Sequence, residues 1–288
     1  MTTKAKHPLN NIFFFIKIYY YSDFLKEDIP VAFPNLDSKN MAITVFEAMP
    51  HVLGSFDSEL QQETEAQFER EHINIQTETM VTKVNPKAVT VRLKNGDIQN
   101  IDYGLLVWVA GIGTRPIVHA LSECITDPKQ RSRRGLQVDG CLRVVGIQNA
   151  GSIFALGDCG ISGHAPTAQV ASQEGRYCAT VLNALQEKEN RHVKASTFDL
   201  VDVLPNVNTF EYKHKGSFAY IGNGKAVAQI PKFSGDGNSE ENWNVNGRAT
   251  YAAWRGVYWT KLLSVKNRFL VGGDWIKTEV FGRALSRE

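Results

Sequence analysis

Residues Ile153–Gly175 read IFALGDCGISGHAPTAQVASQEG, and this stretch decides the fold. An apolar run ends on Gly157-Asp158, a loop of small residues follows, and Pro166 begins a predicted helix that runs to about Glu187. Proline suits a first helical turn, where its missing N–H costs nothing. The carboxylate of Asp158 can accept hydrogen bonds from polyol hydroxyls, and the free amides at the helix start can bind an electron-rich ring oxygen. Taken alone, the stretch also fits an aspartate that caps an ordinary helix.

The composition is that of an ordinary globular protein. The chain has 288 residues, 43% hydrophobic and 22% charged, which is enough for one large domain or two smaller ones. The formal net charge of +2 gives no signal for a nucleic-acid partner. The four cysteines are widely spaced without a CxxC pair, so we expect reduced, structural thiols.

The region before this stretch predicts half of a dinucleotide-binding domain. A strand over Ala42–Glu47 ends on a carboxylate, and Asn95-Gly96 is typical of a hairpin turn. The continuous apolar run Leu105–Ala110 predicts a parallel strand covered on both faces. Between these we expect an exposed helix over 56–71, strands over 73–76 and 80–84, and the two hairpin strands over 88–93 and 98–101.

Two features of this half-domain bear on chemistry. Glu47 stands where an acidic residue accepts hydrogen bonds from adenosine ribose hydroxyls, although a solvated acid at a strand end is the simpler alternative. Ala110-Gly111-Ile112-Gly113 lets the backbone approach a ligand closely, or is a plain strand exit. No GxGxxG loop precedes Glu47, because residues 1–40 contain no glycine.

The N-terminal run IFFFIKIYYY, residues 12–21, is aromatic and apolar but too short to span a bilayer. No signal or transit peptide can be read from it. It fits a buried strand, a contact with a membrane surface, or a stretch that is not native to the fold.

The C-terminal region carries a helical pattern with aromatic residues on one side. Over 250–268, Tyr251, Trp254 and Tyr258 recur at spacings of three and four, with cations elsewhere. The pattern fits a helix in a membrane interface, but by itself it favours a protein core or dimer interface. Four aromatic residues are the candidate membrane contacts: Trp254, Tyr258, Trp259 and Trp275. No metal site is predicted, because the acidic run from Asp236 lacks the glycine and glutamate of a calcium loop.

Seven blocks, in order, resemble the type II, non-proton-pumping NADH–ubiquinone oxidoreductases. Four are general to flavoproteins that use pyridine nucleotides: VFEAMPHVLGSFD (45–57), LLVWVAGIGTRP (105–116), RGLQVDGCLRV (134–144) and IFALGDC (153–159). The other three are PTAQVASQEGRYCA (166–179), YKHKGSFAYIG (212–222) and DWIKTEVFGR (274–283), of which the first and the last are more specific. The resemblance covers residues 41–288 and, more faintly, 22–40.

The resemblance implies a cofactor set and a site. Members carry FAD, oxidise NADH by hydride transfer to the flavin, and pass electrons to a membrane quinone. Glu47 then resembles the NADH ribose acid, and Ala110 and Gly111 the loop beside the nicotinamide. Asp158 matches the carboxylate on the FAD ribityl and phosphate arm. Two glutamines one turn apart and their neighbour match the flavin and quinone contacts: Ala168, Gln169 and Gln173.

The same resemblance implies an incomplete α/β fold of two dinucleotide-binding, Rossmann-like domains with a C-terminal membrane-binding α+β region. We expect an atypical N-terminus and remnant of the NADH domain over 1–40, the second half of that domain over 41–113, the returning part of the FAD domain over 114–190, and a membrane-associating domain over 191–288. Partners implied are a quinone, the mitochondrial inner membrane surface, and a second copy through the C-terminal region.

Two functional hypotheses follow, because both glycine-rich loops of complete family members are missing here. In one, the chain is a fragment of an NADH–quinone oxidoreductase, and residues 12–21 are a gene-model artefact such as translated intron. In the other, it is a truncated, catalytically inactive paralogue that binds membranes and pairs with an intact enzyme.

Overall fold

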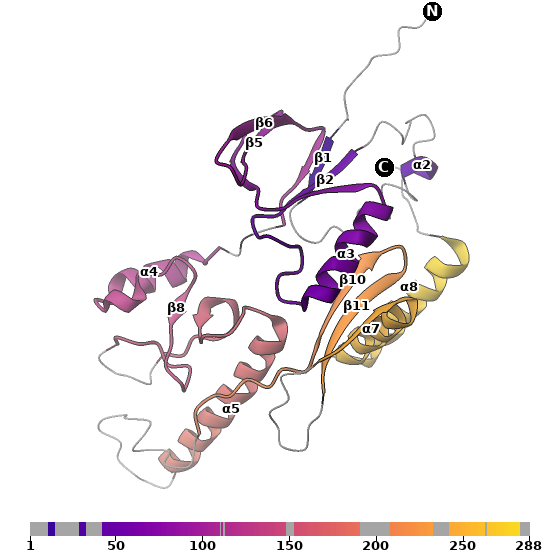
Figure 1. The fold of residues 1–288 in the computed structure, drawn as a ribbon. Helices are drawn as coiled ribbons and strands as arrows, with labels where there is room; N and C mark the ends of the chain where they lie inside the picture. Colours follow the sequence, from indigo (N-terminus) through magenta and orange to yellow (C-terminus); the bar gives the residue numbers. More distant parts are fainter. Residues whose placement is uncertain are drawn as a thin grey trace, which may run out of the picture. The chain divides into compact units, whose positions relative to one another are not determined.

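A computed structural model describes residues 11–14, 29–32, 42–109, 111, 113–147, 153–190, 208–232, 242–262 and 264–282. The chain forms two compact units (Figure 1). The first unit joins residues 1–110 to residues 215–288, and the second is residues 111–214. Each unit is described by itself.

A four-stranded parallel sheet forms the centre of the first unit. Its order is β3 (Ile73–Gln76), β2 (Ala42–Phe46), β1 (Asn11–Phe14) and β7 (Leu105–Val107). Strand β1 comes from the N-terminal aromatic run and pairs with β2 on one side and with β7 on the other. Of the three alternatives left open for that run, residues 11–14 therefore take the strand, and residues 15–21 lie outside the described residues.

A three-stranded antiparallel sheet packs on the parallel one. Strands β4 (Met80–Val84), β5 (Ala88–Arg92) and β6 (Ile98–Asp102) follow one another, and the β5–β6 hairpin turns at Gly96 with φ +89°, as predicted. Val89 and Val91 of β5 are fully buried against Phe46 of β2. These apolar contacts hold the two sheets together.

Strand β7 differs from the expectation of a strand covered on both faces. It ends at Val107, Leu105 is 45% exposed and Trp108 is 53% exposed. The cause is its place in the sheet, because β7 is the last strand in the order of the described residues. An apolar run alone does not tell a central strand from an edge strand.

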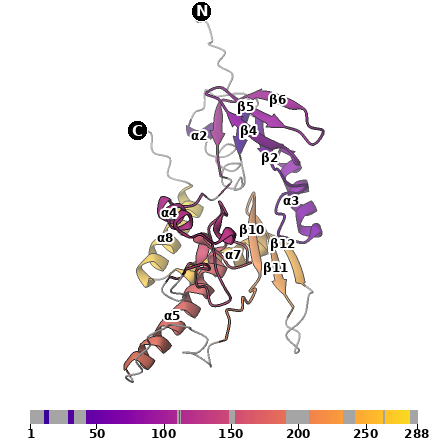
Figure 2. The same cartoon turned by 90° about the vertical axis from the view of Figure 1, so that its left-hand side faces the viewer.

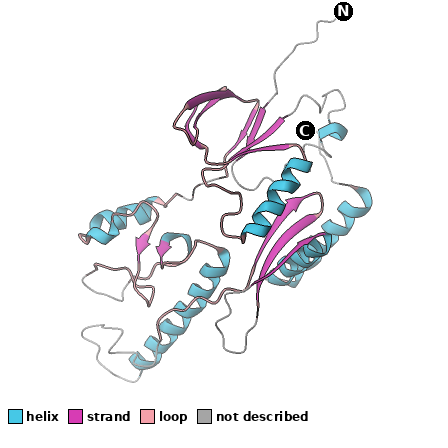
Figure 3. Cartoon of the chain, viewed as in Figure 1, coloured by secondary structure: helices cyan, strands magenta, loops and turns pink. Residues whose placement is uncertain are grey.

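Helix α3 (Ser58–Arg70) lies between two sheets, so the prediction of an exposed helix was wrong. Leu60 and Phe68 are each 1% exposed. One side of the helix contacts β3, and the other contacts the C-terminal sheet, where Leu60 packs with Ile221 and Val227 (Figures 1 and 3). Polar side chains also face these contacts, which is why the sequence pattern concealed them.

The C-terminal sheet is antiparallel, in the order β10 (Ser217–Gly222), β11 (Lys225–Pro231) and β12 (Asn242–Gly247). Helices α7 (Arg248–Lys261) and α8 (Val265–Phe281) follow it. One face of the sheet packs on α3, and Tyr220 on the other face stacks with α7 (Figure 2). A short helix, α2 (Ile29–Ala32), completes the described elements of this unit.

The second unit is built around a small core. The elements are α4 (Pro116–Cys124), the 3₁₀ turn η3 (Pro128–Gln130), β8 (Leu136–Gln137), the 3₁₀ turn η4 (Gly157–Cys159), β9 (Gly160–Ile161) and α5 (Ala168–Asn190). Leu136, Val144 and Ala155 form the core. The apolar run before Gly157, residues 153–156, forms only a single bridge, between Phe154 and Arg143, and η4 begins directly after it.

Candidate functional site

Glu47 lies at the carboxyl edge of the parallel sheet, directly after β2. Its side chain is only 7% exposed, and Oε1 accepts a hydrogen bond from the backbone N–H of Met49 at 2.9 Å. The backbone of Glu47 makes two hydrogen bonds of 3.0 Å each. Its N–H donates to the carbonyl of Gln76, and its carbonyl accepts from the N–H of Thr79. Strands and turn therefore hold one carboxylate in a fixed place at the edge where α/β sheets bind ligands.

The loop after β7 is described in part. Ala110 lies outside the described residues, and Gly111 begins the second unit with φ +78°. A side chain at Gly111 would meet no atom within 4 Å, so the glycine serves the backbone conformation rather than a close contact.

The opening stretch of sequence folds as a tight turn against the first turns of α5. Gly157 has φ +67°, and a Cβ there would lie 3.3 Å from Cβ of Ala171 in α5. A Cβ on Gly160 would lie 2.6 Å from the carbonyl oxygen of Ala155. Asp158 is exposed between these glycines. The η4 turn thus packs against the first turns of α5.

Glu174 holds this turn, although no role was predicted for it. It lies in α5 and is 1% exposed, yet both of its oxygens are hydrogen-bonded. Oε2 accepts from the backbone N–H of Gly157, and Oε1 accepts from the hydroxyl of Ser162, each at 2.6 Å. The sequence shows only that Glu174 follows Gln173 in the predicted helix. The structure is needed to show that its side chain points inward.

Three side chains of α5 hold an extended segment, residues 208–214, along the helix; we call this segment the strap. Gln169 accepts a hydrogen bond from the hydroxyl of Tyr212 at 2.9 Å. Both polar atoms of the Gln173 amide bond the backbone of Lys213, at 2.9 and 3.0 Å. One turn further, the Tyr177 hydroxyl donates to the carbonyl of Asn208 at 2.9 Å. The spacing of four predicted the shared helix face, but not the strap that covers it.

Rings gather where the strap meets the loop before α5. His164 lies 5.8 Å from Phe210 and 5.2 Å from Tyr212, measured between ring centroids. The Tyr212 hydroxyl also lies 3.0 Å from His214 Nδ1. Burial raises the pKa of Tyr212 above its ordinary value. Burial, and then the hydrogen bond to Cys141, raises the pKa of Tyr177.

The aromatic residues of the C-terminal region are divided between core and surface. Tyr251 and Trp254 of α7 stack with each other and with the buried Tyr220. Tyr258 is 54% exposed. The sequence pattern alone left a protein core and a membrane contact as alternatives for this face. In the structure, Tyr251 and Trp254 pack against the sheet, whereas Tyr258 is exposed.

A cation–π contact and a hydrogen bond connect α7 and α8. The Trp275 ring lies under the Arg255 guanidinium at 4.4 Å, which is a cation–π contact between the helices. The Trp259 indole donates to the carbonyl of Arg268 at 2.8 Å. Both predicted tryptophans thus help to pair the helices.

Helix α8 exposes a row of apolar side chains. Val265, Phe269, Ile276 and Val280 are each more than 60% exposed and recur at spacings that place them on one helix face. No helix of the described ranges has the length and apolarity to cross a bilayer.

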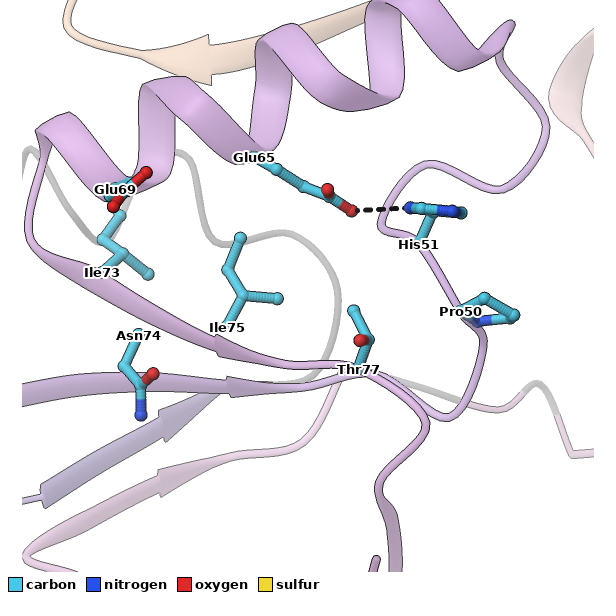
Figure 4. Close-up of a pocket in the computed structure, with 8 residues that line it drawn as sticks. All are labelled: Pro50, His51, Glu65, Glu69, Ile73, Asn74, Ile75 and Thr77. Atoms are coloured by element: carbon cyan, nitrogen blue, oxygen red, sulfur yellow. Dashed lines mark hydrogen bonds and ion pairs between the residues drawn. The ribbon is translucent and has the colours of Figure 1, made fainter. Parts of the chain in front are cut away.

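An open cavity of about 450 Å³ lies between α3 and β3 (Figure 4). His51 Nδ1 lies 3.2 Å from Glu65 Oε1 across it. Its lining is polar on the helix side and is formed by Pro50, His51, Glu65, Glu69, Ile73, Asn74, Ile75 and Thr77. None of the predicted site residues lines this cavity.

Comparison with protein families gives two matches along the chain. Residues 32–175 match the pyridine nucleotide-disulphide oxidoreductase family, and residues 214–284 match the NDH2 C-terminal domain. The first match covers half of the chain and includes Glu47, the η4 turn and the start of α5. The second includes the C-terminal sheet with α7 and α8.

Similar proteins point the same way. An external alternative mitochondrial NADH–ubiquinone oxidoreductase of Yarrowia lipolytica is 38% identical over 92% of this chain and 49% of that protein. The external mitochondrial NADH–ubiquinone oxidoreductase 2 of Saccharomyces cerevisiae is 34% identical over 91% of this chain and 48% of that protein. The chain thus spans about half the length of these curated relatives.

A solved structure shares the fold. NDH2 of Plasmodium falciparum, in complex with NADH, has a TM-score of 0.79 at 22% identity and covers 97% of this chain and 68% of that chain. The match over residues 32–175 covers half of the chain, and it shows that the chain belongs to the pyridine nucleotide-disulphide oxidoreductase family.

Proposed function

We propose that this protein takes part in NADH oxidation with FAD, transferring a hydride from NADH to the flavin and electrons onward to a quinone at a membrane surface, without pumping protons. The single observation that carries the proposal is the η4 turn, where Asp158 and the start of α5 meet and Glu174 fixes the backbone. The names of the relatives, NADH–ubiquinone oxidoreductases, support the same reaction.

The residues present fit the adenosine end of NADH. Glu47 is buried at the carboxyl edge of a parallel sheet, and Oε1 is already engaged by Met49 N–H. Within the described residues no hydrogen bond reaches Oε2, which can therefore accept one from a ribose hydroxyl. A carboxylate there also repels the 2′-phosphate of NADPH, so Glu47 favours NADH. The loop at Ala110 and Gly111 is proposed to lie beside the nicotinamide.

The second unit fits FAD. Asp158 is exposed at a turn where Gly157 has φ +67° and Gly160 has no room for a Cβ, and its carboxylate can accept hydrogen bonds from the ribityl chain. The first turn of α5, with Ala168 and Gln169, offers backbone N–H groups and the positive end of the helix dipole to the flavin ring. FAD supplies hydride acceptance and electron transfer, and the protein supplies position and electrostatics.

The quinone is proposed to bind where the strap meets α5. Gln169 lies beside the Tyr212 hydroxyl, and Gln173 fixes the strap backbone at Lys213. The strap then forms a wall of the quinone site, with Gln169 close to both the flavin and the quinone.

The C-terminal region is proposed to lie on the mitochondrial inner membrane as a peripheral surface, and a second copy is proposed to pair through the same region. The exposed residues Tyr258, Phe269 and Ile276 support a membrane contact. The mitochondrial names of the relatives support the location.

Flavin retention tests the proposal directly. The purified chain is scanned for flavin absorbance, then mixed with NADH under nitrogen, and finally with a short-chain ubiquinone. Retained flavin that NADH bleaches and the quinone restores is the result that supports the proposal for the chain itself. A chain that holds no flavin when supplied with excess FAD contradicts the proposal and favours the non-catalytic alternative. Glu47→Gln, which loses the carboxylate but keeps its shape, is expected to weaken NADH binding about tenfold while flavin retention stays unchanged.

A further inference from the structure

We propose that a cationic loop of the second unit, residues 129–134, binds the phosphate groups of anionic phospholipids. We call this segment the basic loop. The inference rests on the proposed function, because it requires a protein that lies on a membrane. The loop adds a charge-dependent contact, in another unit, to the apolar contact proposed for the C-terminal region. All the contacts that carry the inference lie within the second unit.

The basic loop concentrates positive charge in a short segment. Four of its six residues are cations: Lys129, Arg131, Arg133 and Arg134. All four are exposed, whereas the whole chain carries a formal net charge of only +2. Within the described residues, no ion pair joins any of the four to a carboxylate. Their charge is therefore available to an anionic partner in solution.

A buried glutamine closes the basic loop. Gln130 is 0% exposed, and its Nε2 donates to the carbonyls of Gln137 and Val145, each at 2.8 Å. Its Oε1 accepts from the backbone N–H of Gln137 at 2.9 Å. These bonds join the two ends of residues 130–137. A loop that is already closed loses less conformational freedom when it binds, so its cations are prepared for a ligand.

Further contacts hold the inner side of the loop and leave the cations outside. The Ser132 hydroxyl accepts from the backbone N–H of Arg134 at 3.1 Å. A Cβ at Gly135 would lie 2.6 Å from the carbonyl oxygen of Cys159, so the chain there lies directly on the η4 turn.

The acidic residue nearest to the basic loop along the chain is Asp127. Its carboxylate accepts from the backbone N–H of Lys129 at 2.9 Å and so caps the 3₁₀ turn η3. One carboxylate offsets one positive charge, and the loop with its cap therefore keeps an excess of three.

The chemistry of the basic loop selects a phospholipid surface. Three of its four cations are arginines, whose planar guanidinium groups bind phosphate oxygens through two hydrogen bonds at once. Clusters of roughly four to eight such cations are typical of segments that bind anionic lipid, and each cation strengthens binding about fivefold. Residues 129–134 contain no aromatic side chain on which a nucleic-acid base could stack, and no apolar one for the centre of a protein interface.

Peripheral proteins are held stably on membranes by two weak signals together, an apolar insertion and a polybasic patch. Helix α8 exposes Phe269 and Ile276 for the first signal. The basic loop supplies the second. Because the loop and α8 belong to different units, each signal can be removed without altering the other.

Co-sedimentation with vesicles of two compositions tests the basic loop. The full chain is mixed with vesicles of phosphatidylcholine alone, or of phosphatidylcholine with phosphatidylglycerol, and the bound fraction is measured. The wild type is expected to bind the anionic vesicles about tenfold more tightly, or more, than the neutral ones. The triple variant Arg131→Gln, Arg133→Gln and Arg134→Gln is expected to lose this advantage and to bind neutral vesicles as the wild type does.

A second triple variant is the matched control. Lys83→Gln, Lys87→Gln and Arg92→Gln also removes three positive charges, at exposed positions on β4, on β5 and in the turn between them. It is expected to keep the preference for anionic vesicles. An equal loss in both triple variants makes total charge the cause and overturns the assignment to the loop, as does a preference that the loop variant retains. Neutral binding without an anionic preference in the wild type overturns the loop alone, and a wild type that binds neither vesicle overturns the proposed membrane contact as well.

Competing salts separate a lipid surface from a single phosphate ion. Sodium chloride and sodium phosphate of equal ionic strength are expected to release the protein from anionic vesicles equally, because screening weakens contact with a charged surface. Phosphate that releases the protein much more strongly than chloride does would place a free phosphate ion in the loop and overturn the lipid assignment.

Trypsin gives a readout on the wild type that is resolved by site. It cuts after lysine and arginine, so the basic loop carries its own cleavage sites. Anionic vesicles are expected to slow cutting after Arg131, Arg133 and Arg134 several-fold, and neutral vesicles are not. Cutting after Lys83 and Lys87 is the internal reference. Cutting in the loop that neither kind of vesicle slows relative to this reference contradicts the lipid contact.

Discussion

The backbone N–H of Gly157 donates to Glu174 Oε2 at 2.6 Å, and this contact joins two segments that are 17 positions apart. It ties the turn that presents Asp158 to the inner side of α5. The same carboxylate binds the Ser162 hydroxyl, so a single buried side chain fixes both ends of the glycine-rich loop. The positions of Asp158 and the helix start therefore depend on Glu174.

Glu174→Gln is expected to destabilise the second unit. An amide keeps one acceptor but turns an N–H₂ group toward a second donor, so either Gly157 or Ser162 loses its bond. Hydrogen bonds to charged groups contribute about 1.5–3 kcal/mol each, and the loss should be of that size. Urea unfolding measures it. Ser162→Ala, which removes one partner, should cost less, and equal stability of all three proteins would contradict the role of Glu174.

Gly160→Ala tests how tightly the η4 turn packs. The added Cβ would lie 2.6 Å from the Ala155 carbonyl oxygen, a distance that forces the backbone to move. Overpacking of this kind costs about 1–3 kcal/mol, and thermal unfolding should show it. Gly113→Ala is the control in the same unit, because its Cβ would meet no atom within 4 Å. A drop in melting temperature shared by both variants would mean that the crowding at Gly160 is not the cause.

Gln173→Ala is expected to loosen the strap. The amide makes both of its polar contacts to the Lys213 backbone, and their loss leaves Tyr212 and Tyr177 as the nearest attachments to α5. Trypsin should then cut after Lys213 several-fold faster, which timed digestion and mass spectrometry can follow. Thr180→Ala changes the same helix, where the hydroxyl bonds only the Arg176 carbonyl one turn back, and should leave the cutting rate unchanged.

The sequence predicted those parts of the fold whose signals are local. The hairpin at Asn95-Gly96, the strand before Glu47 and the helix after Pro166 each rest on a short pattern, and the structure has all three. The helix begins at Ala168, so Pro166 precedes it and does not lie in its first turn as predicted; the Thr167 hydroxyl accepts a hydrogen bond from Val170 N–H at this end of the helix.

The parts that the sequence could not predict depend on contacts between distant segments. The burial of α3 needs a second sheet from residues 217–247, and the exposure of β7 follows from its place at the end of the strand order. The inward direction of Glu174 and the strap on Gln173 likewise need partners 17 and 40 positions away. Periodicity reports which residues share a face, and it does not report what that face meets.

The buried phenols predict how stability depends on alkaline pH. Burial raises the pKa of Tyr212 and, more strongly, that of Tyr177 in the folded state. A raised folded-state pKa means that stability is fully present below the unfolded value of about 10 and is lost as pH rises beyond it, because the unfolded chain ionises first. Phenolate absorbance should show tyrosines that ionise only on unfolding. In Tyr177→Phe the decline of stability above this pH should be shallower, and an unchanged slope would count against the burial of the hydroxyl.

The apolar row on α8 makes the membrane proposal testable residue by residue. Phe269 is 77% exposed and Ile276 is 67% exposed, so replacing both with aspartate should leave the fold intact. Burying a side chain of this kind contributes about 1.5–3 kcal/mol, so the double variant Phe269→Asp with Ile276→Asp should bind phosphatidylcholine vesicles at least tenfold more weakly.

The control for that experiment carries the same change in net charge. Asn267→Asp with Lys277→Gln alters two exposed polar positions on α8 and, like the first pair, lowers the charge by two. Neutral vesicles keep electrostatic attraction to lipid out of the comparison, and co-sedimentation measures the bound fraction. If the control pair lost binding as fully as the aspartate pair, charge rather than burial of the α8 row would govern the contact. If neither pair lost binding, the row would lie away from the lipid surface, and the membrane contact would have to be sought elsewhere on the chain.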